Sequence, residues 1–387
     1  MKYLLLITIS ILYLGCGGSS SNCTFQPFLH NLLLSEYFWA DKIDKSVNYK
    51  KYTTPQSMID GLKYTPIDRW SMAITKEENS NFMNQKSGGF GFAYKKDTNG
   101  DIVVIYTRLD SPAFKAGLKR GDIIEAIDNQ EPTLEQMKIA SSDINKSSLF
   151  RVYRASSDEY LEIGIVSQEY TFSVTKVSTV SSEKNKTIGY MRFDSFTATA
   201  TEEIDKAFDY FKEQHIKKLV IDMRYNGGGS VVTASILLDK LIRDRDEEIQ
   251  FKMVWNDNYK YKNQVGRFET DENSLALDTI IFLTSKNSAS ASELVINSLK
   301  PYLGDRVVII GSKTHGKPVG MEGRTDGTYI YYLVNFVIQN RDGFYDYFDG
   351  LEVTDGCEVE DDLTHQLGDR EEKMLKKALF YIDNNHC

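Results

Sequence analysis

Long hydrophobic runs are missing from this 387-residue sequence. Nowhere do about 18 apolar residues follow one another, which excludes an internal transmembrane helix of ordinary length. Proline is scarce, with 7 residues, so long proline-rich linkers are not expected. Basic residues are in deficit, since 46 Lys and Arg stand against 55 Asp and Glu. The resulting net charge of −9 argues against nucleic acid as a partner.

Histidine and cysteine are too few and too scattered to suggest a metal site. The five His residues lie far apart, and the four Cys residues form no CxxC pair. No metal or other cofactor is therefore expected. Cys357 and Cys387 bracket one C-terminal segment, which predicts a disulfide between them and leaves Cys23 as the odd residue.

The residues that are present suit a folded protein of several domains. Hydrophobic residues make up 41% and aromatic residues 12% of the chain, enough to bury a core, so a mainly disordered chain is excluded. The length fits two or three domains, or one domain with additions.

The first fifteen residues are predicted to be a secretion signal rather than part of the fold. Residues 3–14 are apolar, and Leu14-Gly15-Cys16 resembles a lipobox. We expect a cleaved signal over 1–15, a lipid on Cys16, and a Gly/Ser-rich tether over 16–23. The alternative is an ordinary signal peptide with a chance cysteine. A lipobox predicts a lipoprotein anchored to a membrane of the cell envelope and facing the periplasm; Gly17 favours the outer membrane.

The character of the sequence changes twice further along the chain. A region rich in aromatic and helix-forming residues over 24–86 predicts a small helical N-terminal region without catalytic residues. Short strands and turns over 87–168 predict a small β-rich domain. Apolar runs alternate with amphipathic helices over 169–387, which predicts an α/β domain with a mainly parallel sheet. Thr199 and Glu202 fit a capping box at the start of one of its helices.

The β-rich region resembles a PDZ domain. Gly89-Phe90-Gly91-Phe92 resembles the carboxylate-binding loop, and residues 111–122 resemble the helix and turn of bacterial PDZ modules. Backbone N–H groups in a glycine-rich turn can hold a terminal carboxylate, and a strand edge can pair with an extended peptide. The resemblance implies peptide binding at Gly89, Phe90, Gly91 and Phe92. The alternative is that these glycines only permit a tight hairpin.

Two segments of the α/β domain carry residue types suited to catalysis. Ser290 follows a buried strand and opens a helix, whose unpaired N–H groups could stabilise an oxyanion. Because Ser290-x-x-Glu293 also fits a capping box, the serine could serve only as a cap. Asn226-Gly227-Gly228-Gly229 lies between a strand and a helix and could supply a further oxyanion donor.

A third segment, residues 311–317, nearly matches a phosphate-binding loop. Pro318 stands where Ser or Thr should hold magnesium, and residues 319–323 are predicted to be a loop rather than the required helix. We therefore reject nucleotide binding. The role of Lys317 then needs another explanation.

Together, these segments resemble the carboxy-terminal processing proteases, also called tail-specific proteases. The resemblance rests on residues 89–92, 222–229, 288–293 and 314–317. It implies an α/β, multi-domain fold: a core related to the crotonase and ClpP folds with an inserted PDZ domain. It implies a serine endopeptidase with Ser290 as nucleophile, Lys317 as general base and Glu293 as a supporting acid. The oxyanion donors would be the N–H groups of Ala291 and Gly228, with Gly229 as an alternative to Gly228.

Lys317 must lose its proton to act as a base near pH 7. A free lysine has a pKa of about 10.4, so the pKa must fall by roughly 3, and only burial or a neighbouring cation achieves this. We therefore expect Lys317 to be substantially buried. His315 points the same way as Lys317 if the chain is extended, so a Ser–His site is the alternative. The family often has Gln where this chain has Met321, which favours a second hypothesis: an inactive, peptide-binding lipoprotein.

Overall fold

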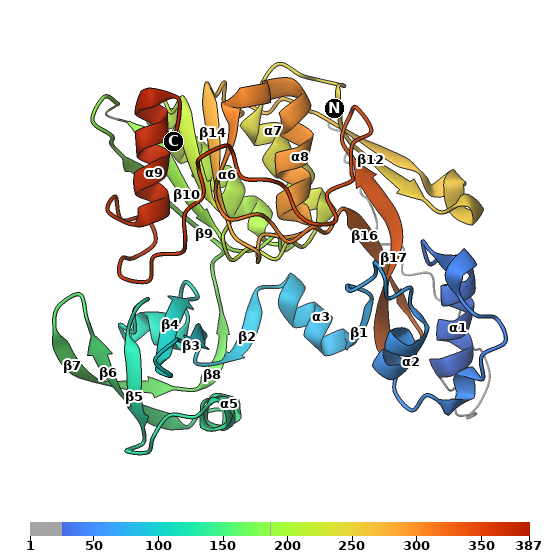
Figure 1. Cartoon of the computed structure of the whole chain (residues 1–387), viewed down its shortest axis with the longest axis horizontal. Helices are drawn as coiled ribbons and strands as arrows, with labels where there is room; N and C mark the ends of the chain where they lie inside the picture. Colours follow the sequence, from blue (N-terminus) through green and yellow to red (C-terminus); the bar gives the residue numbers. More distant parts are fainter. Residues whose placement is uncertain (1–24, 186) are drawn as a thin grey trace.

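The computed structural model describes residues 25–185 and 187–387. The predicted signal, the predicted lipidation site Cys16, the predicted tether and Cys23 lie outside these residues. The chain forms three parts: the N-terminal helices, a β-rich domain and a larger α/β domain (Figure 1). In the described parts of the chain, no helix is long and apolar enough to cross a membrane.

The N-terminal region contains three α-helices, two short 3-10 helices and one strand. The side chain of Thr54 accepts a hydrogen bond from the Ser57 N–H and thereby caps the second helix, which starts with a proline. The apolar faces of the first two helices pack against the long strand β17 (Tyr329–Gln339). The elements are α1 (Phe25–Ser35), Ala40–Lys42, Tyr49–Lys51, α2 (Pro55–Leu62), β1 (Met72–Thr75) and α3 (Lys76–Met83).

The middle domain, defined here as residues 90–167, is an antiparallel five-stranded sheet with two helices. Its core forms around Phe90 and Phe150, whose rings meet edge to face at 5.1 Å. The strand β2 (Lys86–Gly89) precedes this domain in the sequence and β8 (Gln168–Thr171) follows it. The two strands pair antiparallel with each other and join the domain to the rest of the chain. The elements are β3 (Phe92–Lys96), β4 (Ile102–Thr107), α4 (Pro112–Lys115), β5 (Ile123–Ile127), α5 (Leu134–Ser142), β6 (Ser147–Arg154) and β7 (Glu159–Val166).

The α/β domain is built on a sheet with the order β15-β14-β11-β10-β9. Four strands are parallel and β9 runs antiparallel to β10. Successive side chains of a strand point to opposite faces, so Leu219 and Ile221 meet α6, α7 and α8, whereas Val220 meets α9 on the other face. The elements are β9 (Thr175–Val180), β10 (Ile188–Phe193), α6 (Ala200–Glu213), β11 (Lys218–Asp222), α7 (Val231–Leu241), β14 (Thr279–Thr284), α8 (Ala291–Leu303), Gly304–Arg306, β15 (Val307–Gly311) and α9 (Lys373–Asn384).

A second sheet connects the α/β domain to the N-terminal region. The long strand β17 pairs with β1, β12 and β16, and β13 continues beyond β12. The prediction of a loop over 319–323 is wrong, because β16 pairs antiparallel with β17 from Val319 onward. The elements are β12 (Ile249–Trp255), Asp257–Lys262, β13 (Gln264–Arg267), β16 (Val319–Thr325) and β17 (Tyr329–Gln339).

The predicted capping box at Thr199 is also wrong. Thr199 does precede α6, but its side chain makes no capping hydrogen bond. Its hydroxyl donates instead to the side-chain oxygen of Gln85, a residue far away in the sequence. A tertiary contact has replaced the local one.

The C-terminal segment is joined by a disulfide between Cys357 and Cys387. Both cysteines adjoin the apolar cluster that α9 forms with the sheet. The disulfide therefore holds the end of the chain close to the sheet.

Arg120 joins the middle domain to the α/β domain. Its buried guanidinium donates to the carbonyl oxygens of Asp362 and His365, both at 3.1 Å, and pairs with Asp361. Gly121, next to it, lies so close to the opposite backbone that a Cβ there would come within 2.2 Å of the Leu363 oxygen. The two domains are therefore in direct contact at this point.

Candidate active site

Ser290 lies at the turn between β14 and α8. Its backbone has φ 57° and ψ −111°, in the left-handed region that non-glycine residues seldom adopt. Such strain is typical of functional sites, where the surrounding structure holds a side chain in a required direction. Ala291 is the first residue of α8, and in the described chain its N–H donates no hydrogen bond. An oxyanion could accept from it.

Glu293 connects the loop that carries Ser290 to the loop that carries Lys317. One carboxylate oxygen accepts from the backbone N–H groups of Ser290, at 2.8 Å, and Lys317, at 2.9 Å. The other accepts from the Gly316 N–H and the Thr314 hydroxyl, both at 2.6 Å. Glu293 is fully buried. This carboxylate therefore fixes the two loops relative to each other, beyond the local bond expected of a capping box.

Lys317 stands between β15 and β16, and its side chain lines a cavity of about 550 Å³. Burial lowers the pKa of its amine from 10.5 to about 8, although the negative charges of Asp68 and Glu293 act in the opposite direction. No residue of 25–185 or 187–387 hydrogen-bonds the Lys317 Nζ. The amine therefore has no hydrogen-bond partner within the described residues, and its lowered pKa agrees with the burial that the sequence predicted.

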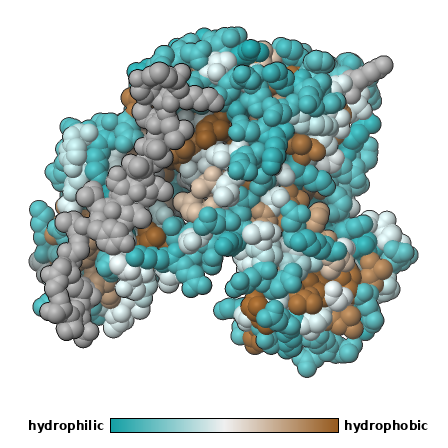
Figure 2. Space-filling view, turned by 180° about the vertical axis from the view of Figure 1, so that it is seen from behind, coloured by the Kyte–Doolittle hydropathy of each residue, from teal (hydrophilic) through white to brown (hydrophobic). Residues whose placement is uncertain are grey.

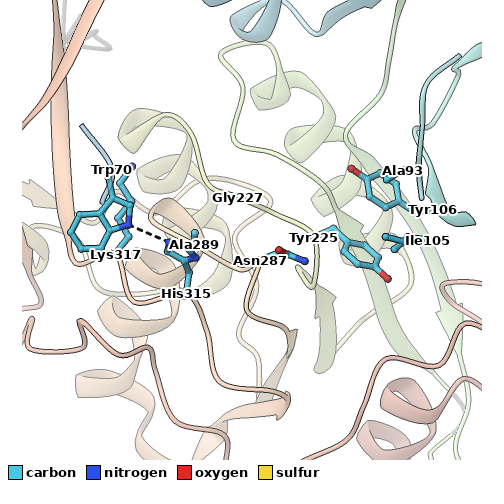
Figure 3. Close-up of a pocket in the computed structure, with 10 residues that line it drawn as sticks. All are labelled: Trp70, Ala93, Ile105, Tyr106, Tyr225, Gly227, Asn287, Ala289, His315 and Lys317. Atoms are coloured by element: carbon cyan, nitrogen blue, oxygen red, sulfur yellow. Dashed lines mark hydrogen bonds between the residues drawn. The ribbon is translucent and has the colours of Figure 1, made fainter. Parts of the chain in front are cut away.

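The cavity lies where all three parts of the chain meet. Figure 3 shows Trp70, His315, Lys317 and Ala289 on one side and residues of the middle domain on the other. An extended polypeptide could contact both sides. The full lining is Trp70, Ala93, Ile105, Tyr106, Tyr225, Gly227, Asn287, Ala289, His315 and Lys317.

Gly228 lies directly against the loop that carries Ser290, but its N–H already donates a hydrogen bond. A Cβ on Gly228 would come within 2.8 Å of the Ser290 Cβ, and the residue has φ +97°. Its N–H donates to the Asn226 Oδ1 at 2.9 Å. The oxyanion role predicted for Gly228 would require this bond to break. The N–H of Gly229, the predicted alternative, donates no bond within the described residues.

The predicted peptide-binding residues form a tight turn between β2 and β3, at the start of the middle domain. Gly89 and Gly91 have φ values of +108° and +80°, and a Cβ at Gly91 would clash with Ser111 at 2.3 Å. Phe90 is buried in the core of the domain. Close packing alone explains these glycines, so the turn by itself does not decide between peptide binding and a structural hairpin.

The N-terminal region, predicted to hold no catalytic residues, contacts the loop that carries Lys317. Arg69 donates to the carbonyl oxygens of His315, at 3.0 Å, and Phe348, at 2.9 Å. Trp70 donates its indole N–H to the His315 Nε2 at 3.2 Å. Asp68 is buried close enough to Lys317 to influence its pKa. These hydrogen bonds join residues 245 to 279 positions apart, so no local pattern could have predicted them.

In the described chain, no group of three His, Cys, Asp or Glu residues could hold a metal ion. The chemistry available at this site is that of a serine, an amine with a lowered pKa and backbone N–H groups.

Comparison with known proteins identifies the family. Residues 187–341 match peptidase family S41, and residues 28–72 match the peptidase S41 N-terminal domain. The chain belongs to peptidase family S41. Ser290, Glu293 and Lys317 all lie within the first match, and Asp68, Arg69 and Trp70 lie within the second.

Curated relatives of this S41 protein include the "Probable CtpA-like serine protease" of two staphylococci. The Staphylococcus epidermidis protein is 27% identical over 308 residues, 73% of this chain and 57% of the relative. The Staphylococcus saprophyticus protein is 24% identical over 365 residues, 87% of this chain and 71% of the relative. The chain thus spans little more than half the length of the Staphylococcus epidermidis protein.

Solved structures share the fold of this S41 protein. A crystal structure from Bacteroides fragilis, assigned by its name to the S41 proteases, covers 96% of this chain and 100% of its own, with a TM-score of 0.80 and 21% identity. The photosystem II D1 C-terminal processing protease covers 87% of this chain and 92% of its own, with a TM-score of 0.52 and 17% identity. The mixed α/β architecture is therefore that of S41 proteases.

Proposed function

We propose that this S41 protein is a serine endopeptidase in which Ser290 is the nucleophile and Lys317 the general base. The observation that carries the proposal is the buried Glu293 carboxylate, one oxygen of which accepts from the backbone of both residues. The lowered pKa of Lys317, about 8, gives a usable fraction of neutral amine at neutral pH.

The reaction follows from these groups. The neutral Lys317 amine takes the proton of the Ser290 hydroxyl as its oxygen bonds to the scissile carbonyl carbon. The carbonyl electron pair moves to its oxygen, which accepts from the Ala291 N–H. The tetrahedral intermediate collapses, and the departing amine takes the proton from Lys317. Water, deprotonated by Lys317, then hydrolyses the acyl-serine ester and restores both side chains.

We further propose that the middle domain is a PDZ domain that binds the C-termini of substrates, so that cleavage occurs in or near C-terminal regions. Two observations support this. Ala93 lies on its edge strand β3 and also lines the catalytic cavity. Hydrophobic side chains gather on this domain at the lower right of Figure 2, and its exposed apolar residues include Leu134, Ile139 and Val166.

An apolar peptide tests the role of the middle domain. A peptide with a free C-terminal carboxylate should bind near Gly89 to Phe92, and amidation should weaken binding sharply. Equal affinity for acid and amide would remove the carboxylate-loop interpretation without affecting the catalytic one.

We also propose that the protein is a lipoprotein of the cell envelope, anchored through Cys16. The support is the lipobox resemblance of Leu14-Gly15-Cys16. Cys16→Ser should release the protein into the soluble fraction, and mass analysis should find a lipid on Cys16. A mature chain starting at another residue would contradict this proposal.

Cleavage of an unfolded protein such as casein distinguishes a protease from an inactive binding protein. The purified chain should cleave it, and Ser290→Ala should not. Met321 in place of glutamine and the occupied Gly228 N–H are the observations that favour an inactive protein. No cleavage of several unfolded substrates, with peptide binding retained, would favour that second function.

A further inference from the structure

We propose that His315 is a positioning residue that holds the Lys317 loop against the Ser290 loop, and that Trp70 sets its tautomer. This proposal rests on the proposed function, because it assigns His315 a role in Ser–Lys catalysis.

His315 connects the two catalytic loops by two hydrogen bonds. Its backbone N–H donates to the Ser288 oxygen at 3.0 Å. Its ring Nδ1 lies 3.2 Å from the Lys286 oxygen. Ser288 and Lys286 precede Ser290 by two and four positions, and Lys317 follows His315 by two positions. A displacement of the His315 ring would therefore change the distance between nucleophile and base.

The partners of the ring specify one protonation state. The Lys286 carbonyl can only accept, so Nδ1 must carry a proton to bond it. The Trp70 indole N–H can only donate, and it lies 3.2 Å from Nε2, so Nε2 must be unprotonated. Together they select the neutral ring with its hydrogen on Nδ1. Figure 3 shows the Trp70–His315 hydrogen bond beside Lys317.

The same contacts argue against His315 as the general base. A base needs a free ring nitrogen directed at the serine hydroxyl. Here the unprotonated nitrogen, Nε2, is occupied by Trp70, and the other bonds the Lys286 carbonyl. His315 thus acts through loop geometry rather than by accepting the Ser290 proton.

Two amide substitutions separate the roles of the two ring nitrogens. The Asn side-chain amide can take the place of Nδ1–H and bond the Lys286 carbonyl, whereas the longer Gln amide reaches the place of Nε2. His315→Gln and His315→Ala should each lower kcat by about 10- to 100-fold, because small misplacements of catalytic groups have effects of this size. KM should stay within about twofold, and His315→Asn should recover most of the lost kcat.

Trp70→Phe tests the tautomer directly. It removes the indole donor but keeps an aromatic ring, and Trp255→Phe is the matched control, since Trp255 is also buried but does not line the cavity. In nitrogen-15 NMR spectra at pH 8, His315 of the unmodified protein should show a proton on Nδ1. Trp70→Phe should give a mixture of tautomers, and Trp255→Phe should not.

The possible outcomes distinguish a failure of the role proposed for His315 from a failure of the Ser290–Lys317 assignment. If the Asn, Gln and Ala variants of His315 all kept a kcat close to that of the unmodified protein, the positioning role would be overturned. Complete inactivity of all three, at the level of Ser290→Ala, would overturn it in favour of a Ser–His site. If the unmodified protein cleaves nothing, the proposed function fails. The NMR spectra still test the tautomer of His315, because a proton on Nε2 in the unmodified protein would contradict the proposed arrangement.

Discussion

Lys317 is the residue whose ionisation should control the reaction. In the proposed mechanism its neutral form is the base, and its pKa of about 8 means that this form grows as pH rises through 8. We therefore expect kcat/KM to rise about tenfold per pH unit below 8 and to level off above it. A pH–rate profile from 6 to 10 on an unfolded substrate checks this expectation. A profile that is flat or falls between pH 6 and 8 would contradict the role of Lys317.

Gly228 is required by the space beside Ser290. A Cβ there would lie 2.7 Å from the Ala289 oxygen and 2.9 Å from the Ala291 nitrogen, in a backbone conformation unfavourable for alanine. Gly228→Ala should lower kcat by at least about 100-fold, because it displaces the nucleophile loop. It should also cost about 1–3 kcal/mol of unfolding free energy through backbone strain. Steady-state kinetics and urea denaturation measure the two effects.

Gly227→Ala is the matched control, because a Cβ on Gly227 meets nothing within 4 Å. It should keep most of the activity and stability. Similar losses in both variants would show that the loop tolerates no side chain anywhere, and the argument from Gly228 would fail.

At the scale of the element, local patterns predicted the strands and the helix that position Ser290 and Lys317. The buried strand before Ser290 and the helix after it are β14 and α8, and the apolar run before Lys317 is β15. Apolar strands and N-terminal turns are encoded locally, which explains this success. The strand β16 was predicted as a loop because its residues 319–323 include two glycines, and only pairing with β17 makes it a strand.

The C-terminal helix α9 depends on the Cys357–Cys387 disulfide for part of its attachment. Replacing both cysteines by alanine should lower the free energy of unfolding by about 3–4 kcal/mol, because a closed loop spanning 30 residues restricts the unfolded chain. Urea denaturation of the oxidised protein measures this. Reduction should destabilise the unmodified protein and leave the double variant unchanged; equal midpoints of the two oxidised proteins would contradict the expectation.

At the scale of the whole molecule, the site depends on contacts that span almost the entire chain. Trp70 and Arg69 reach the Lys317 loop from the N-terminal region, and Ile105 and Tyr106 complete the cavity from the middle domain. Sequence could indicate Ser290, Lys317 and Glu293 because each lies in a recognisable local motif. It could not indicate Trp70, because its role depends on a tertiary contact with His315. Nor could it indicate that the Gly228 N–H is occupied, because this depends on the orientation of the Asn226 side chain.

The docking of the middle domain can be tested with two glycines. Gly121 and Gly117 both have positive φ, so alanine should strain both backbones by a similar amount, about 1–2 kcal/mol. Only Gly121 faces the α/β domain, since its Cβ would meet the Leu363 oxygen at 2.2 Å and that of Gly117 meets nothing. Small-angle scattering should show an altered domain arrangement for Gly121→Ala alone. Identical scattering of the two variants would contradict the docking.

The most direct test of the Ser290–Lys317 assignment is the activity of Lys317→Arg on an unfolded protein substrate. Arginine keeps the positive charge and much of the length of the side chain, but its guanidinium cannot release a proton under these conditions. We predict that Lys317→Arg is as inactive as Lys317→Ala and Ser290→Ala, while all three variants remain folded by circular dichroism. Substantial cleavage by Lys317→Arg would show that Lys317 is not the base and would contradict the account.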